Sequence, residues 1–326
     1  MSEFNILITD GMAKGPAADL QSVKNFNVTL RDSTSVDDLK KLAADANCIV
    51  VRSATTVTRE IIDLAPQLKL ILRAGAGVDN IDVAYATEKN IPVMNTASAN
   101  AMAAAEHTIA LMFSMLRSTP QASLSLREKR WDRKTFVGFE ATGKTIGVLG
   151  LGNIGSIVAQ KAIGLGMNVL GYDPMIKSTS QLPSFLANQS ESFVLASGLD
   201  EVFEKSNILT LHIPKTKDTA NIINKARLET MQNGSFIINC SRGGLVVENA
   251  VLAALESGKL RGAAFDVYDP EPPAFDSGIF DHPQIVCTPH LGASTVEAQE
   301  RVGATAASQI KGFFLDGKKA GIINGI

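Results

Sequence analysis

The chain has 326 residues, and at roughly 150 residues per domain this length suggests about two domains. Its composition is 45% hydrophobic and 20% charged, which is ordinary for a globular protein and excludes a disordered or fibrous chain. The 31 basic and 33 acidic residues give a net charge of −2, which removes the main electrostatic reason to expect nucleic acid or an anionic membrane as a partner.

Cysteine usage and the most apolar segments exclude further classes of protein. The three cysteines show no metal-type spacing, so neither a disulfide scaffold nor a metal site is expected, and they fit the reducing cytoplasm. The N-terminus has no basic region followed by an apolar stretch, and no signal peptide is expected. The most apolar long segment, Ala101–Leu116, contains Glu106 and His107 and predicts a buried helix, not a membrane span.

Short apolar runs alternate with helical patterns along the first part of the chain. Strands are expected at residues 5–8, 48–52, 68–72 and 92–94, with helices such as 36–46 and 59–64 between them. A long helical stretch at 99–116, with a second run to about residue 129, follows this series. Alternation of this kind predicts a parallel sheet covered by helices on both faces.

The alternation then restarts. Strands are expected at 145–149, 168–172, 207–212, 235–239, 263–267 and 285–288, with helices that include 154–165, 225–231 and 248–257. A last helix is expected at about 295–315. Two successive series separated by a long helix predict an α/β protein with two Rossmann-like, doubly wound parallel-sheet domains and a cleft between them.

The strand at 145–149 leads into Gly-Leu-Gly-Asn-Ile-Gly at residues 150–155, and a helical pattern follows. This is the G-x-G-x-x-G sequence in the strand–turn–helix context of a dinucleotide-binding loop. The first glycine permits a tight turn, the second lets backbone N–H groups approach a pyrophosphate, and the third lets the helix pack closely on the strand. The N-terminus of the helix then faces the anion with its positive dipole end.

An acidic residue, Asp173, ends the next strand and lies 18 residues after Gly155. A carboxylate at that position can accept hydrogen bonds from the adenosine ribose hydroxyls. It would repel the additional phosphate of NADP, and no arginine follows it at 174–176. The sequence therefore favours NAD as the cofactor.

Polar side chains follow three strands of the second series at their carboxyl ends, where ligands bind in open α/β sheets. Arg242 follows the strand at 235–239, Asp266 and Glu271 lie at and beyond the end of 263–267, and His290 follows 285–288. A histidine can take a hydroxyl proton, a carboxylate can fix its ring, and an arginine can hold a carboxylate or polarise a carbonyl. The set suits hydride transfer at a hydroxy acid.

The chain has four histidines, of which two compete for the role of the base. His290 and His212 both stand at strand ends, and position favours His290 without excluding His212. His107 lies inside an apolar helix and is expected to be packed and hydrogen-bonded, and His282 lies in a loop and is expected to be solvated.

Four ordered motifs then indicate a family. The glycine loop at 148–155, Asn-Cys-Ser-Arg-Gly-Gly at 239–244, the acidic and proline-rich segment 265–273, and Pro-His-Leu-Gly-Ala-Ser-Thr at 289–295 resemble the D-isomer-specific 2-hydroxyacid dehydrogenases. Within that family, segments 51–55, 73–80, 93–96, 131–134 and 171–174 are similar to those of the phosphoglycerate dehydrogenase branch. The resemblance spans nearly the whole chain.

The resemblance implies a role for each member of the polar set. His290 would be the acid/base, Glu271 its partner, and Arg242 the ligand of the substrate carboxylate and carbonyl, while Asp266 would contact the nicotinamide amide. It also implies a discontinuous substrate-binding domain of residues 1–98 and 291–326 around an NAD-binding domain of residues 99–290. A homodimer or homotetramer through the helix at 99–116 is expected.

The candidate cofactor-binding residues are Ala76, Gly150, Gly152, Asn153, Ile154, Gly155, Asp173, His212, Ile213, Pro214, Cys240, Ser241, Arg242, Asp266, His290, Gly292 and Ala293. The candidate substrate-binding residues are Arg52, Ser53, Arg73, Gly75, Ala76, Gly77, Asn100, Arg133 and Lys134. The four cationic side chains in the second set are candidates for holding a substrate phosphate.

The implied activity is NAD-dependent oxidation of D-3-phosphoglycerate to 3-phosphohydroxypyruvate, which opens serine biosynthesis. Ala76 stands where this branch commonly has threonine, and Ser-Ala-Asn at 98–100 departs from its usual Pro-Asn-Gly-Asn pattern. Two alternatives therefore stay open: a glyoxylate/hydroxypyruvate or D-lactate-type reductase, and a non-catalytic NAD-sensing protein. About 36 residues follow His290, and we expect no serine-binding regulatory domain and no serine feedback.

Overall fold

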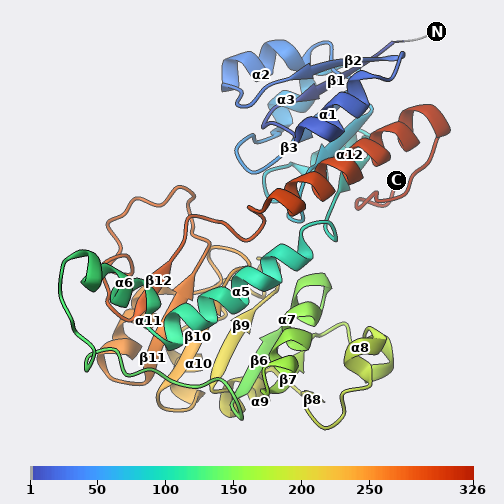
Figure 1. Ribbon diagram of the computed structural model, residues 1–326. Helices are drawn as coiled ribbons and strands as arrows, with labels where there is room; N and C mark the ends of the chain where they lie inside the picture. The colour runs from blue at the N-terminus through green and yellow to red at the C-terminus, as the bar shows by residue number, and fades with distance from the viewer. Residues whose placement is uncertain (1–2) are drawn as a thin grey trace. The chain divides into compact units, whose positions relative to one another are not determined.

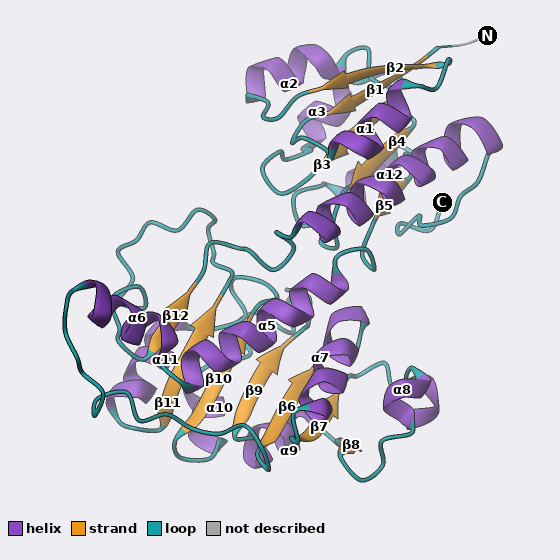
Figure 2. Ribbon diagram, viewed as in Figure 1, coloured by secondary structure: helices purple, strands orange, loops and turns teal. Residues whose placement is uncertain are grey.

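The structure is a computed structural model that describes residues 3–326, and it divides into two compact units. The terminal unit reaches to Asn100 and resumes at Ala293, and the central unit runs from Ala101 to Gly292. Each unit contains a parallel sheet with helices on both faces (Figures 1 and 2). This confirms the predicted class of two doubly wound α/β domains.

The terminal unit contains a five-stranded sheet in the order β2-β1-β3-β4-β5. The strands are β1 (Phe4–Ile8), β2 (Phe26–Leu30), β3 (Cys48–Val51), β4 (Leu70–Arg73) and β5 (Val93–Asn95). Helices α1 (Lys14–Gln21) and α12 (Val296–Asp316) cover one face, and α2 (Val36–Ala43), α3 (Arg59–Asp63) and α4 (Val83–Glu88) cover the other.

The buried strands of this unit are apolar throughout because both faces of the sheet are covered. Successive residues of a strand point to opposite faces, so Ile6 packs with Leu20 and Val302 under α1 and α12. Leu7, the next residue, packs with the cluster under α2 and α3. Helix α12 thus brings the last part of the chain onto the first, and Lys311 binds Asp19 at 2.6 Å.

The central unit contains a seven-stranded sheet in the order β12-β11-β10-β9-β6-β7-β8. The strands are β6 (Thr145–Leu149), β7 (Asn168–Tyr172), β8 (Phe193–Leu195), β9 (Ile208–Leu211), β10 (Ser235–Asn239), β11 (Leu260–Phe265) and β12 (Ile285–Cys287). Strand β6 lies between β7 and β9, so the strand order reverses there, and ligands of doubly wound sheets bind at such a reversal.

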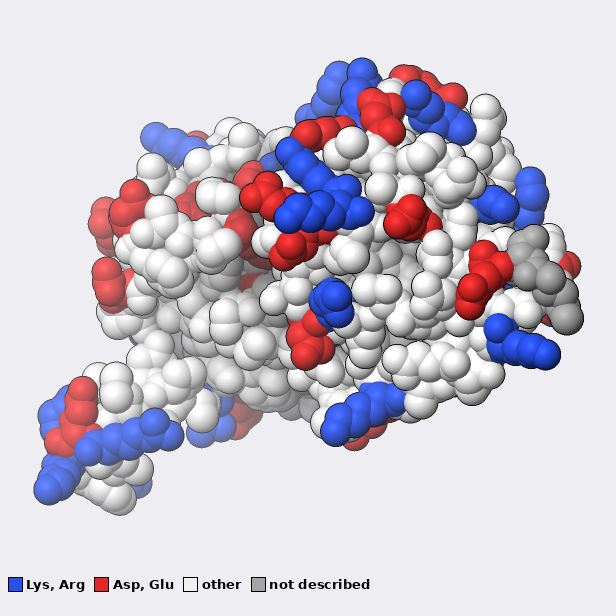
Figure 3. All heavy atoms as spheres, turned by 90° about the horizontal axis from the view of Figure 1, so that it is seen from above, with Lys and Arg blue, Asp and Glu red and all other residues white. Residues whose placement is uncertain are grey.

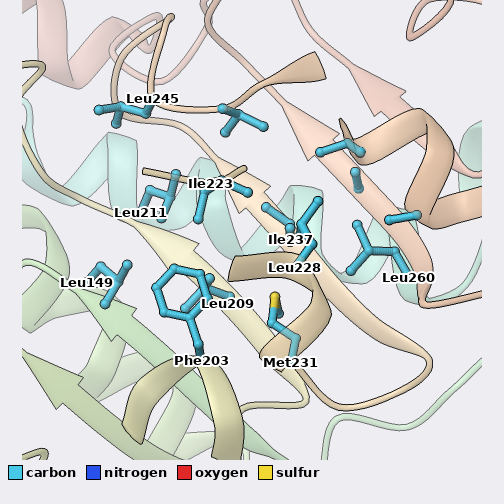
Figure 4. Packing of buried hydrophobic residues seen from close by; sticks show 14 of the residues in the cluster. Leu149, Phe203, Leu209, Leu211, Ile223, Leu228, Met231, Ile237, Leu245 and Leu260 are labelled. Carbon is cyan, nitrogen blue, oxygen red and sulfur yellow. The ribbon is translucent and has the colours of Figure 1, made fainter. Parts of the chain in front are cut away.

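Helices cover both faces of the central sheet (Figure 2). Helices α5 (Ala101–Leu116) and α7 (Asn153–Gly164) lie on one face, and α9 (Leu199–Lys205), α10 (Lys225–Thr230) and α11 (Glu248–Glu256) lie on the other. Figure 4 shows Phe203 and Leu228 packing from this second layer against Leu209, Leu211 and Ile237 of the sheet. The remaining helices are α6 (Thr119–Arg127), α8 (Ser184–Ala187) and the short 3₁₀ turn η1 (Thr179–Gln181).

The sequence patterns missed two strands, β2 and β8, and each lies at an edge of its sheet. Most residues of both strands are only partly buried or exposed, so neither gives the continuous apolar run of an inner strand. Strand β10, whose five residues are all buried, has the predicted bounds.

Candidate active site

The glycine loop connects β6 to α7 at the strand-order reversal. A Cβ on Gly150 would collide with the carbonyl of His212, and one on Gly155 would collide with the carbonyl oxygen of Gly150. A Cβ on Gly152 would meet no heavy atom within 4 Å. The fold itself therefore requires the first and third glycines, whereas the second leaves an open approach to the N-terminus of α7.

Asp173 follows β7 and holds this loop in place. Its Oδ2 accepts a hydrogen bond from the backbone N–H of Leu151 at 3.0 Å, and its Oδ1 accepts one from Met175 at 2.9 Å. The carboxylate is partly exposed beside the open approach. A glycine cradle with a fixed acid at the next strand end fits the pyrophosphate and ribose of a dinucleotide.

His290 and Glu271 form a hydrogen-bonded pair in the central unit. The Nδ1 of His290 lies 2.7 Å from Oε2 of Glu271, and Oε1 of Glu271 accepts from the backbone N–H of Tyr268 at 2.9 Å. The hydrogen bond to Glu271 raises the pKa of His290 more than burial lowers it. Burial acts to raise the pKa of Glu271, but the hydrogen bonds from His290 and Tyr268 outweigh it, and the pKa falls below its usual value. The carboxylate therefore stays ionised and orients the ring.

The positive charge of Arg242 acts on this pair and tends to lower the pKa of His290. Its guanidinium donates to the carbonyl of Ser241 at 2.6 Å, and its own carbonyl accepts from the Nδ2 of Asn239 at 2.9 Å. The following residue, Gly243, packs so tightly that a Cβ there would collide with the carbonyl of Tyr268. The loop that carries Arg242 is thus packed against the segment that leads to Glu271.

His212, the competing base, has different surroundings. Its Nε2 lies 3.0 Å from Oγ1 of Thr210, and its Nδ1 is enclosed without a hydrogen-bond partner among the described residues. Burial lowers the pKa of His212 to about 3, so the ring stays neutral across the physiological range. The burial and the low pKa of His212 disfavour a role in proton transfer.

Asp266 is fully buried beneath the turn that carries His290. Its Oδ1 accepts from the N–H of Leu291 at 2.7 Å and from Oγ1 of Thr288 at 2.6 Å, and its Oδ2 accepts from the N–H of Gly292 at 2.8 Å. His107 lies 3.1 Å from Oδ1. Both carboxylate oxygens of Asp266, which were expected to face a nicotinamide amide, are thus engaged by the protein. They hold the backbone directly after His290 and the side chain of Thr288 before it.

Two of the expected phosphate-binding residues, Arg52 and Arg73, stand at the ends of the neighbouring strands β3 and β4 in the terminal unit. Nη2 of Arg73 donates to Oγ of Ser53 at 3.1 Å, and Arg52 precedes Ser53 in the loop after β3. The carbonyl of Ala76, between Gly75 and Gly77, accepts from Asn95 at 2.9 Å.

The other members of the two candidate sets are spread over both units. Asn100 is buried, and its Oδ1 has no hydrogen-bond partner within residues 3–326, whereas Arg133 and Lys134 are exposed residues of the central unit. Ser241 donates from its hydroxyl to the carbonyl of Ile213 at 2.5 Å, which ties the segment with Pro214 to the Arg242 loop. Asn153 and Ile154 begin α7, and Ala293 begins the returning part of the terminal unit.

Sequence patterns did not indicate the contacts of four residues: Asp10, Asn80, Thr288 and His107. Asp10 follows β1 at its carboxyl end, which is the same position that singled out Arg242 and His290. Asn80 lies in the segment 73–80, and its side chain hydrogen-bonds to the carbonyls of Arg52 and Thr55. The Nε2 of His107 lies 3.1 Å from both Oδ1 of Asp266 and Oγ1 of Thr288.

Other features limit the chemistry of the chain. Among residues 3–326, no cluster of histidine, cysteine, aspartate and glutamate could hold a metal ion. Burial raises the pKa of Cys240 to about 12, so the thiol beside the site stays protonated.

Acidic and basic side chains are interspersed on the face drawn in Figure 3. None of the helices in the described part of the chain is long and apolar enough to cross a membrane.

Fold, glycine loop and polar set together define a doubly wound dinucleotide-binding protein. The family model for the D-isomer specific 2-hydroxyacid dehydrogenase, NAD binding domain, matches residues 109–292. The chain belongs to the D-isomer-specific 2-hydroxyacid dehydrogenase family, as its motifs predicted, and NAD is its cofactor.

The chain is 42% identical to the D-3-phosphoglycerate dehydrogenase of Methanocaldococcus jannaschii over 306 residues, which cover 94% of this chain and 56% of that protein. It spans just over half the length of the curated relatives it matches. The NAD⁺-bound 3-phosphoglycerate dehydrogenase of Entamoeba histolytica superposes with a TM-score of 0.82 at 27% identity over 100% of both chains. The D-lactate dehydrogenase of Aquifex aeolicus, complexed with NAD and lactic acid, gives 0.85 at 26% identity over 99% of this chain and 100% of that one.

Proposed function

We propose that the chain is an NAD-dependent dehydrogenase that oxidises D-3-phosphoglycerate to 3-phosphohydroxypyruvate, the reaction that opens serine biosynthesis. The observation that carries this proposal is the 2.7 Å hydrogen bond between His290 and Glu271 beside Arg242, in a domain of an NAD-dependent dehydrogenase family. The curated relatives at about 40% identity, which bear the name of this enzyme, support the choice of substrate.

The three polar side chains divide the chemistry. Neutral His290 takes the proton of the C2 hydroxyl through Nε2, because Nδ1 faces Glu271. The imidazolium that forms is stabilised by the ionised carboxylate of Glu271. The guanidinium of Arg242 holds the substrate carboxylate and polarises the developing carbonyl oxygen. NAD, held by the glycine loop at 150–155 and by Asp173, would supply the acceptor for the hydride that leaves C2.

The cofactor-binding part of the proposal rests on the glycine loop and on Asp173. The loop and the N-terminus of α7 would hold the pyrophosphate, and the carboxylate of Asp173 would accept from the ribose hydroxyls. The same charge would repel the ribose phosphate of NADP. His212, Ile213, Pro214, Cys240 and Ser241 would line the rest of the cofactor site.

The substrate-binding part of the proposal rests on the terminal unit. Arg52, Ser53 and Arg73 would bind the phosphate, and the backbone at 75–77 would bind the carboxylate. We propose the terminal unit as the substrate-binding domain and the central unit as the cofactor-binding domain, whose limits lie within two residues of the boundaries expected at residues 98 and 291. Arg133 and Lys134 would reach the site of a second subunit.

A homodimer or homotetramer and a cytoplasmic location complete the proposal. Exposed apolar side chains on and after α6, namely Leu124, Leu126 and Trp131, support association through the α5–α6 region. The thiols, which form no disulfide among the described cysteines, fit a reducing compartment.

The test compares initial rates with NAD and NADP on D-3-phosphoglycerate, D-glycerate and D-lactate, together with reduction of 3-phosphohydroxypyruvate. We expect a strong NAD-linked preference for the phosphorylated acid, abolished in His290→Asn. Arg52→Ala should raise KM for the phosphorylated substrate ten-fold or more, on the order of 1.4 kcal/mol. Activity on unphosphorylated acids alone would keep the His290 chemistry and refute the phosphate site.

A further inference from the structure

The loop after β3 is held by the carboxylate of Asp10, which lies in the segment that follows β1. Oδ2 of Asp10 accepts hydrogen bonds from the backbone N–H groups of Arg52 at 2.6 Å and Thr55 at 3.2 Å. Oδ1 of the same side chain accepts from Oγ1 of Thr55 at 2.5 Å. One carboxylate thus binds both ends of the four-residue segment 52–55, although the two sequences lie more than 40 residues apart.

Asn80 holds the same segment from its carbonyl groups. Its Nδ2 donates to the carbonyls of Arg52 at 2.8 Å and Thr55 at 2.5 Å. Its Oδ1 accepts from Nε of Arg73 at 3.3 Å. A single amide therefore connects the loop after β3 to the cationic side chain at the end of β4.

The contacts of Asp10 and Asn80 with Arg52 and Thr55 form a hydrogen-bonded frame around two exposed residues. The N–H and the C=O of both Arg52 and Thr55 are engaged, while Ser53 and Ala54 between them are exposed. Arg73 completes the frame, because it donates from Nη2 to Ser53 and from Nη1 to the carbonyl of Ala74 at 2.9 Å. The loop is thus ordered by the protein before any ligand arrives, which removes an entropic cost from binding.

The residues held by this frame carry groups that can bind an anion. Arg52 and Arg73 supply guanidinium groups, whose planar forks match a phosphate, and Ser53 supplies a hydroxyl that can donate. Asp10 and Asn80 do not add a positive charge, and an acidic residue in this position is unfavourable to an anion by itself. Their contribution is therefore geometric.

We propose that Asp10 and Asn80 are positioning residues that determine specificity for a phosphorylated substrate, because they hold Arg52, Ser53 and Arg73 in one anion-binding arrangement. This inference rests on the proposed phosphate role of those three residues. Neither Asp10 nor Asn80 touches the substrate in this scheme, and neither takes part in the chemistry at His290.

The test uses 3-phosphohydroxypyruvate and hydroxypyruvate, which differ only in the phosphate, with NADH as reductant. Asp10→Ala and Asn80→Ala should each raise KM for the phosphorylated substrate about ten-fold, with kcat changed less than three-fold. Their KM for hydroxypyruvate and for NADH should stay within about two-fold of wild type, because those ligands do not use the frame. A merely structural role would alter both substrates alike.

Asp10→Asn is the matched control. Asparagine keeps one oxygen for the two backbone N–H groups, and its amide can donate to the hydroxyl of Thr55, which also accepts. We expect KM for the phosphorylated substrate within about three-fold of wild type, whereas a purely electrostatic role of Asp10 would make asparagine and alanine equivalent. Equal KM values for the two Asp10 variants would overturn the geometric argument.

Thr55→Val is the milder variant should either alanine variant fail to fold, since it removes only the hydrogen bond to Oδ1 of Asp10. It should raise KM for 3-phosphohydroxypyruvate about two- to five-fold and leave that for hydroxypyruvate unchanged. An unchanged KM ratio in Thr55→Val overturns the inference.

Arg52→Ala separates failure of the inference from failure of the proposed function. If Arg52→Ala raises the phosphorylated-substrate KM and Asn80→Ala does not, the positioning role is wrong and the phosphate site stands. If wild type shows no preference for the phosphorylated substrate, both the positioning role and the proposed substrate are wrong. Thermal denaturation of each variant confirms that the compared proteins are folded.

Discussion

Gly152→Ala isolates the contribution of the cofactor from that of the fold. Gly152 has φ −70° and ψ −161°, an extended backbone that alanine tolerates, and an added Cβ meets no heavy atom within 4 Å. Alanine is a poorer residue than glycine before a helix, by about 0.5 kcal/mol. The reduced freedom of the unfolded chain offsets this by about 0.4–1 kcal/mol. The free energy of unfolding should therefore change by less than about 0.5 kcal/mol, or roughly 2 °C in Tm.

The effect on NAD should be larger. A pyrophosphate oxygen that accepts from the N–H groups at the start of α7 must come within about 3 Å of the backbone, where the new methyl group would stand. We expect the dissociation constant for NADH to rise at least ten-fold, which corresponds to about 1.4 kcal/mol.

The assay pairs NADH titration, followed by fluorescence, with thermal denaturation of the unliganded protein. Gly155→Ala serves as the contrasting variant, because its Cβ collides with the carbonyl of Gly150. That variant should lose stability itself, by about 1–3 kcal/mol. If Gly152→Ala binds NADH as wild type does, the pyrophosphate does not approach this glycine and the assignment of the loop is wrong.

Three further predictions concern the residues around the site. Glu271→Gln removes the interaction that raises the pKa of His290, so this pKa should fall. The acid limb of the pH profile of kcat/KM for oxidation should then move to lower pH, and an unmoved limb would contradict the pairing of the two residues. Gly243→Ala forces the Arg242 loop away from the carbonyl of Tyr268, and kcat should fall by about 100-fold. A kcat near that of wild type would show that this packing does not position Arg242. Asp173→Asn keeps an oxygen for the N–H of Leu151 but loses the negative charge. The ratio of kcat/KM with NAD to kcat/KM with NADP should therefore fall at least ten-fold. An unchanged ratio would mean that this charge does not determine the choice of cofactor.

The parts of the fold that could be predicted are those with a strong local pattern. Strand β10 and the turn at 150–155 are examples, since one is a fully buried apolar run and the other needs glycine at two positions whatever binds there. Edge strand β8 has only three residues, of mixed exposure, and its sequence shows no strand pattern. It is a strand because it pairs with β7.

The candidate site divides in a similar way. Strand ends identified Arg242 and His290 as neighbours of one crevice, but they could not separate His290 from His212, because that distinction depends on burial and on a partner 19 residues away. The engagement of Asp266 by the N–H groups of Leu291 and Gly292 depends on the path of a loop, which has no periodic signal. Tertiary partners of this kind are visible only in the folded chain.

The return of α12 to the terminal unit has a consequence for synthesis on the ribosome. The apolar face formed by Ile6 and Leu20 emerges early, yet the residues that cover it, among them Val302 and Ile310, are translated after the whole central unit. At about 5–20 residues per second, translation from Leu20 to Val302 keeps that face uncovered for roughly 15–55 s. The central unit, a continuous segment, can complete its core during that interval. The nascent terminal unit is therefore the part of this chain with the greatest need of a chaperone, and its vulnerable surface is the face under α12.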